Sequence, residues 1–233
     1  MLIQKDGDAP ERWFAAGFGR LVAAQEQRLC DRLAADSFGF YGVQLGMPAR
    51  KLMRRSPVLR IARIGAADSG CDIAADWSAL PLADDSADVV LLAHALEAAA
   101  EPRAVLREAV RVLRPEGRLV IIGFNPWSLL GFFAKPARAP WRENWLSLAR
   151  VKDWLALLQI TVVRGMFAVF LPPLAESKTR RRFAWLERAG RRWWPLAGGV
   201  YFMLGIKRRT KMRLITPAFR RPPQMAAGQQ MRP

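Results

Sequence analysis

The residues best suited to chemistry in this sequence follow its predicted β-strands. Gly46, Asp76, His94 and Asn125 each come shortly after an apolar run that is typical of a strand. The carboxyl ends of parallel strands meet at one edge of a sheet, and ligands bind there. A histidine, a carboxylate and an amide at that edge could serve acid–base chemistry or hold a polar ligand. The pattern therefore predicts where a site lies without naming its ligand.

Two of these residues are candidates for catalysis. His94 is the sole histidine and lies where a general base could serve, or it could simply hydrogen-bond a ligand or the next loop. Asn125 could present its amide to a substrate, or it could cap a helix predicted over Trp127–Phe133. The sequence shows no spacing typical of metal ligands, and it offers no Ser-His-Asp or Cys-His set.

A strand–helix–strand unit positions the candidate histidine. Ala87–Ala93 is a nearly continuous apolar run, as in strands that are buried on both faces. Pro102–Leu113 has the spacing of an amphipathic helix, which Pro115-Glu116-Gly117 should end, and Arg118–Phe124 is the next buried strand. This order is a βαβ unit, so it predicts a parallel sheet with right-handed crossovers.

Weaker patterns place the remaining elements. Apolar residues at three-, four- and seven-residue spacing predict a helix over Pro10–Ala35, with Gly17 and Gly19 weakening its start. Shorter patterns predict a helix over Ser147–Leu158 and strands over 39–46, 58–64, 72–74, 161–170 and 199–206. We therefore divide the chain into an N-terminal helical extension at residues 1–36, an α/β domain at 37–209 and a flexible basic tail at 210–233.

The stretch from Asp76 to Val90 carries a more specific motif. It reads Asp-Trp-Ser-Ala-Leu-Pro-Leu-Ala-Asp-Asp-Ser-Ala-Asp-Val-Val and resembles the D-x-x-x-L-P-F-x-D-x-S-F-D-V-V signature of type 11 class I methyltransferases. The resemblance continues through His94-Ala95-Leu96-Glu97 to Ile122. It implies a Rossmann-like methyltransferase fold, a mostly parallel seven-stranded α/β sheet flanked by helices with an added N-terminal helix, and S-adenosylmethionine as cofactor. Segments such as Trp193-Trp194 resemble a small bacterial subgroup of these enzymes.

The resemblance also implies roles for individual residues, namely Gly46, Asp76, Trp77, Ser78, Ala93 and His94. The glycine would let the backbone approach the methionine moiety of the cofactor. The aspartate would accept a hydrogen bond from the adenine amino group, with Trp77 and Ser78 beside the ring. Ala93 and His94 would border the sulfonium and the methyl group. Asp76 and Gly46 could instead be ordinary loop residues.

The loop after the first strand departs from the family pattern. Where the family has an acid and three glycines, this chain reads Gln44-Leu45-Gly46-Met47-Pro48-Ala49-Arg50, and proline lacks a backbone N–H. Asp68 is the nearest candidate for the acid that binds the ribose hydroxyls in the family. Three functions follow as alternatives, one of them a lipid-directed enzyme that uses Phe132-Phe133 and Trp193-Trp194 at a membrane surface. In the other two, the chain transfers methyl groups to an acceptor that the sequence does not identify, or it is a lapsed module of this fold that binds RNA, a membrane or a protein.

Positive charge is concentrated in the last quarter of the chain. The formal net charge is +17, and residues 178–233 hold 15 Lys and Arg against one acid, Glu187. Such a field attracts nucleic acid or anionic lipid, or it is a solvated surface. Trp193 and Trp194 could stack on bases or lie at a lipid interface. Arginine pairs bidentately with phosphate, so the sequence favours nucleic acid slightly over membrane.

The location of the protein is predicted from what the sequence lacks. It begins without an apolar leader, its longest uncharged run is short for a membrane span, and its two cysteines, Cys30 and Cys71, suit a reducing compartment. We expect a cytoplasmic protein, with peripheral membrane association as the alternative.

Overall fold

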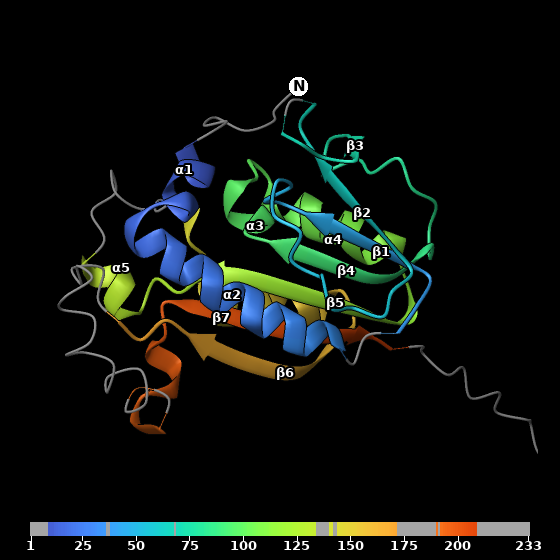
Figure 1. The fold of residues 1–233 in the computed structure, drawn as a ribbon. Coiled ribbons are helices and arrows are strands. Elements are labelled where there is room, and N and C mark those ends of the chain that lie inside the picture. Colours follow the sequence, from blue (N-terminus) through green and yellow to red (C-terminus); the bar gives the residue numbers. More distant parts are fainter. Residues whose placement is uncertain are drawn as a thin grey trace, which may run out of the picture.

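A seven-stranded sheet forms the centre of the molecule (Figure 1). The computed structural model describes residues 9–35, 38–67, 69–133, 140–141, 144–171, 190 and 192–208. The strands are β1 Tyr41–Leu45, β2 Arg60–Gly65, β3 Ile73–Ala74, β4 Ala87–Ala93, β5 Leu113–Phe124, β6 Ile160–Ala168 and β7 Val200–Lys207. They lie in the order β3-β2-β1-β4-β5-β7-β6, so β1 and β4 are neighbours at the middle of the sheet.

The strands are mostly parallel. β1 pairs in parallel with β2 and β4, and β5 continues this direction beside β4. β7 inserts between β5 and β6 and runs antiparallel to both. The mostly parallel seven-stranded α/β sheet predicted from the sequence is confirmed, and the strand order reverses beside β1, where open sheets bind ligands.

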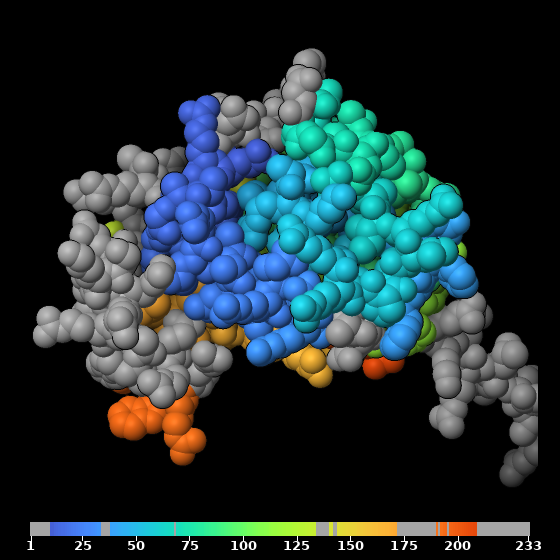
Figure 2. Space-filling view, viewed as in Figure 1, coloured from blue at the N-terminus to red at the C-terminus, as the bar shows by residue number. Residues whose placement is uncertain are grey.

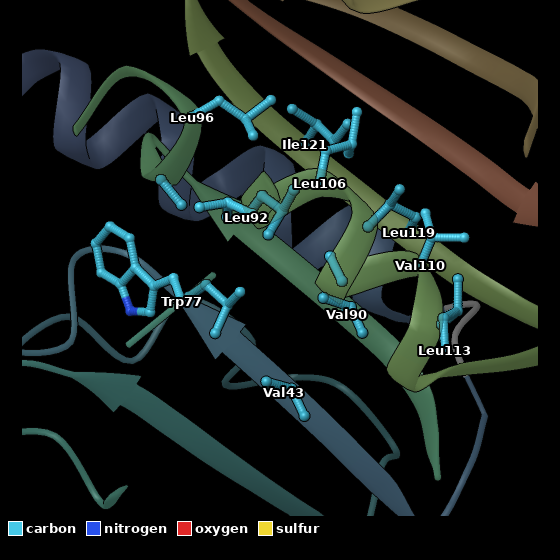
Figure 3. Close-up of a cluster of buried hydrophobic side chains, with 14 of the residues drawn as sticks. Val43, Trp77, Val90, Leu92, Leu96, Leu106, Val110, Leu113, Leu119 and Ile121 are labelled. Carbon is cyan, nitrogen blue, oxygen red and sulfur yellow. The ribbon is translucent and has the colours of Figure 1, made fainter. Parts of the chain in front are cut away.

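One face of the sheet is covered by helices that follow β4 in the chain. The helices are α1 Ala9–Ala15, α2 Gly17–Ala35, α3 Ala95–Ala98, α4 Pro102–Val112, α5 Leu129–Phe133 and α6 Leu148–Leu157, with a 3₁₀ turn η3 at Pro195–Ala197. α4 buries Leu106 and Val110 against Val90 and Leu92 of β4, with Trp77 beside the tip of β1 (Figure 3). The intervening residues of β4, such as Leu91, point to the other face, so the strand is apolar throughout.

The other face is covered by the N-terminal helices. The connection from β1 to β2, residues 46–59, contains no helix, and its apolar residues pack beside α2 (Figure 2). Phe14, Val22 and Leu33 of α1 and α2 complete this second core together with Leu52. The N-terminal helices thus bury a sheet face that crossover helices cover in other α/β folds.

Two predicted boundaries were wrong. The helix predicted over Pro10–Ala35 is two helices, because Gly17 has a left-handed backbone with φ of +50° that ends α1. β5 begins at Leu113 rather than at Arg118, since Leu113 pairs with Ala87 and a bulge takes up the predicted Pro115-Glu116-Gly117 turn. Local sequence signals for a turn do not show whether the chain resumes pairing on the same strand.

The predicted domain division and the question of a membrane span both concern the whole chain. The division at residues 36 and 209 stays a prediction, and residues 210–233 lie outside the described part. Among the described helices, none has the length and apolar character needed to cross a membrane.

Candidate active site

A pocket opens where the carboxyl ends of β1 and β4 meet. It encloses about 270 Å³, part of which is open to solvent. Four of the residues predicted for a site line it, together with the start of α1 and a tryptophan from the segment before α6. The lining residues are Pro10, Glu11, Gly46, Met47, Pro48, Trp77, Ala93, His94, Ala98 and Trp141. The topology thus brings the predicted loops together at one place.

Gly46 brings the two central strands into close contact at this pocket. Its φ of +79° lies in the left-handed region, and a Cβ there would overlap the carbonyl oxygen of Ala93. Any larger residue would force β1 and β4 apart at their ends. Glycine is therefore required for the approach of two backbones, whatever ligand the pocket takes.

Gln44 fixes the loop that follows β1. Its buried side-chain amide donates hydrogen bonds to the carbonyl oxygens of Met47 at 3.1 Å and Arg50 at 2.7 Å, and more weakly to that of Gly46. Its side-chain oxygen accepts a hydrogen bond from the Leu52 amide at 3.2 Å. An amide can satisfy donors and acceptors at once, whereas a carboxylate only accepts. The loop therefore depends on the amide of Gln44, because a carboxylate at this position could not donate hydrogen bonds to the carbonyl oxygens.

His94 is held between two buried carboxylates. Its Nδ1 lies 2.7 Å from Oε2 of Glu97, and its Nε2 lies 2.8 Å from Oε1 of Glu26 in α2. Glu97 also accepts a hydrogen bond from the Phe124 amide at the end of β5. Arg50 donates to Oε2 of Glu26 at 2.7 Å. This cluster joins α2, the loop after β1, α3 and β5 around the inner wall of the pocket.

The charges of the cluster follow from its contacts. Burial by itself would lower the pKa of His94, but the carboxylates of Glu97 and Glu26 outweigh burial and raise that pKa to about 9. Burial opposes the charge of Glu26 as well, yet His94 and Arg50 hold its pKa below the ordinary value. Burial raises the pKa of Glu97, because the hydrogen bonds from His94 and Phe124 only partly offset it. His94 is therefore an imidazolium at neutral pH, with each N–H donated to a carboxylate.

Asp76 and Ser78 form a turn at the rim. Oδ1 of Asp76 accepts hydrogen bonds from the amide and the hydroxyl of Ser78, both at 2.8 Å, and these bonds lower the pKa of Asp76. Trp77 between them is buried, and its indole N–H donates to the Ile64 carbonyl at 2.9 Å. The turn thus anchors an aromatic wall of the pocket to the end of β2.

Asn125 does not line the pocket. Its side-chain N–H groups donate to the carbonyls of Leu196 at 2.8 Å and Gly198 at 3.1 Å, and its oxygen accepts from the Trp127 amide. Ser128 caps α5 by accepting from the Gly131 amide. Asn125 therefore joins the end of β5 to the start of β7, and both N–H groups of its amide are used in doing so.

The comparisons with known proteins agree with this geometry. Residues 48–121 match the family model described as a methyltransferase domain. The uncharacterized protein YafS of Escherichia coli is 32% identical over 169 residues, which cover 70% of each chain. The chain belongs to the class I methyltransferases. Members of this family transfer methyl groups from S-adenosylmethionine, and the matches support this activity for the chain, with an acceptor that they do not identify.

More distant matches support the fold of this methyltransferase. The demethylmenaquinone methyltransferase of Mycobacterium marinum is 44% identical over 55 residues, 24% of each chain. A putative Haloferax volcanii methyltransferase in complex with the Trm112 activator has a TM-score of 0.62, at 17% identity over 86% of this chain and 98% of that one. A possible histamine N-methyltransferase of Thermotoga maritima has a TM-score of 0.59, at 18% identity over 85% and 94%. At these identities the two structures show the shared fold alone.

The structure sorts the predicted site residues of this methyltransferase. Gly46, Trp77, Ala93 and His94 meet at the pocket, with the turn of Asp76 and Ser78 beside Trp77; Asp68 lies outside the described residues. The cofactor-binding roles stay predictions. A general base at His94 also stays a prediction, and the geometry argues against it, because an imidazolium has no lone pair to take a proton.

The residues that sequence reasoning missed lie around His94. The carboxylate of Glu97 could have been found from its position three residues after His94 at a helix start. Glu26 precedes His94 by 68 residues, and no local signal connects them. Glu11 reaches the pocket from α1, which was predicted only as an appendage.

Proposed function

We propose that S-adenosylmethionine binds in this pocket, with its methionine end beside Gly46 and Ala93 and its adenine near Trp77 and Asp76. The observation that carries the proposal is the pocket itself, which lies at the carboxyl ends of the two central strands and is lined by Gly46, Ala93 and Trp77. Oδ1 of Asp76 is used within its own turn, whereas Oδ2 has no partner in the described part of the chain and can accept a hydrogen bond from the adenine amino group.

The pocket is narrow for a cofactor of this size. The open space of about 270 Å³ includes solvent-exposed space, so the enclosed part is well below the roughly 300–1,000 Å³ of typical ligand pockets. Pro10 and Glu11 at the start of α1 form part of its wall. Binding therefore displaces the start of α1 outward, while the Glu26 contacts hold α2 in place.

Glu11 supplies the carboxylate that this family uses to bind the cofactor's hydroxyl or ammonium groups. It is the sole acid among the lining residues, and it makes no hydrogen bond or ion pair within the described ranges. β2 ends at Gly65 and is followed by Ala66, so its described end offers no acid to the pocket. An unpaired carboxylate at the wall suits the donor groups of the cofactor.

His94 acts as a positioning residue. The cofactor supplies an electrophilic methyl group when bound, and the main task of the protein is then alignment. The imidazolium fixes the backbone after β4 through Glu97 and Glu26, and its own backbone is left-handed, with φ of 55°. Rigid support of that backbone keeps Ala93 in place against the methyl group.

Calorimetric titration of the full chain tests the proposal. We expect S-adenosylmethionine and S-adenosylhomocysteine to bind with micromolar Kd, about −8 kcal/mol. Glu11→Gln should weaken binding by about 1.5–3 kcal/mol, the net worth of a hydrogen bond to a charged group. Glu101→Gln is the matched control, because Glu101 is exposed and its side chain does not cap α4. No binding at millimolar ligand would overturn the proposal.

One observation favours the second candidate, a lapsed module that no longer binds the cofactor. The loop from Gly46 to Leu52 is closed around Gln44, and Pro48 lies against Gly65, where a Cβ would be 3.0 Å from its ring. This packing fills the space between the ends of β1 and β2. The same titration decides between the two. If the protein is a lapsed module, neither ligand should release or absorb heat on titration, while circular dichroism should show that the protein is folded.

A further inference from the structure

Two segments at one end of the sheet expose large apolar side chains. They are Trp127–Phe133, which contains α5, and Trp193–Leu196, which leads into β7. Trp127, Phe132 and Trp193 are each 70% exposed or more. Soluble proteins rarely expose contiguous apolar groups of this kind without a binding partner. The exposed residues, called here the aromatic end, are Trp127, Phe132, Phe133, Trp193, Trp194 and Leu196.

The two segments are held next to each other. The Asn125 side chain donates hydrogen bonds to the carbonyls of Leu196 and Gly198, and a Cβ on Gly199 would lie 3.1 Å from the side chain of Leu130. Both segments lie beyond the carboxyl end of β5, at the same end of the sheet (Figure 1). Asn125 therefore connects the two segments through the backbone of Leu196 and Gly198, and Leu130 packs beside Gly199.

The segments next to these residues in the sequence are rich in basic residues. Residues 178–192, which lead directly into Trp193, contain seven Lys and Arg and one acid, and Arg192 itself is exposed. Lys135 and Arg138 follow α5 in the sequence. The described residues of the aromatic end include no acid. Basic residues near an anionic bilayer contribute about 1 kcal/mol each.

We propose that the aromatic end docks onto membranes that contain anionic phospholipid. Tryptophan and phenylalanine beside arginine are typical of protein segments that lie at membrane–water interfaces, where amphipathic rings lie at the level of the headgroups. Binding of single-stranded nucleic acid would call for a positively charged groove with aromatic side chains along it, on which successive bases stack. Here the ring centroids of Trp193 and Trp194 lie 6.2 Å apart, and the exposed Leu196 follows them in the chain. The docked face is at the ligand-binding end of the sheet, and the inference stands whether or not the cofactor binds.

Co-sedimentation of the full chain with vesicles tests this inference. Vesicles of phosphatidylcholine with phosphatidylglycerol are compared with pure phosphatidylcholine, and tRNA is the competing ligand, each at low and high salt. The test variant is Trp193→Ser with Trp194→Ser. The control is Phe38→Ser with Phe40→Ser, two rings that are equally exposed at the other end of β1, beside Asp88. Circular dichroism verifies that both variants fold.

We expect the full chain to bind the anionic vesicles. Its affinity for them should fall about tenfold or more in the tryptophan variant and stay unchanged in the control. Three results would each overturn the inference. The first is no sedimentation with anionic vesicles at low salt. The second is equal binding by both variants, which would mean attraction by charge alone. The third is tRNA binding that depends on the tryptophans without any vesicle binding, which would assign the surface to nucleic acid.

Discussion

Replacing His94 with glutamine removes the positive charge that lies between Glu26 and Glu97. The pKa of His94 is about 9 in the folded protein against an ordinary value of 6.5, because two carboxylates accept its N–H groups. This difference corresponds to about 3 kcal/mol of folding free energy. Because the folded pKa is the higher one, the contribution is fully present below pH 6.5 and is lost as pH rises through about 9.

The assay is urea unfolding of both proteins at several pH values between 6 and 10. The wild type should lose about 3 kcal/mol of unfolding free energy across this range. His94→Gln should be less stable by about 3–5 kcal/mol at pH 6.5, since it leaves buried carboxylates without their cation, and its pH dependence should be flatter. The raised pKa of Glu97 adds a loss of the same sign as pH rises, so Glu97→Gln is measured alongside to separate the two groups.

The outcome that refutes this reasoning is a pair of parallel curves. If wild type and His94→Gln change equally with pH, the imidazole does not carry the proton that the geometry gives it. A neutral His94 would also restore the general base as a candidate, because one ring nitrogen would then keep a lone pair. The experiment therefore decides between a positioning and a catalytic histidine without knowledge of the acceptor.

Two further substitutions test the loop after β1. Gly46→Ala should lower the unfolding free energy by about 2–4 kcal/mol, because its backbone is left-handed and a Cβ would overlap the Ala93 carbonyl. The control is Gly70→Ala, which has the same left-handed backbone but open space around it and should cost only about 1–2 kcal/mol. Equal losses in urea unfolding would show that the contact with Ala93 is not the reason. Gln44→Glu should cost about 2–4 kcal/mol at neutral pH, because a buried carboxylate would face carbonyl oxygens, and stability should recover on acidification. A pH-independent loss in the same assay would show that Gln44 acts by shape alone.

Sequence periodicity determined the central unit of the fold. The apolar run at Ala87–Ala93 and the amphipathic spacing after Pro102 are local patterns, and both formed β4 and α4 as predicted. The Asp76–Val90 motif identified the family, and the order of strands and loops placed the pocket at the carboxyl ends of β1 and β4. These features were predictable because each depends on neighbours within one element or on a rule of topology.

Only the tertiary structure decided how the site residues are used. His94 is charged because it lies between Glu97, three residues later, and Glu26, which belongs to a helix 68 residues earlier. The side-chain N–H groups of Asn125 bond to carbonyls more than 70 residues later. Neither long-range pairing can be predicted from the spacing of nearby residues, because the packing of the whole chain determines the partners of buried charges and amides. The covering of a sheet face by α1 and α2 also depends on long-range packing. The location of the site was therefore predictable from local sequence, whereas long-range contacts determined which of its side chains are available to a ligand.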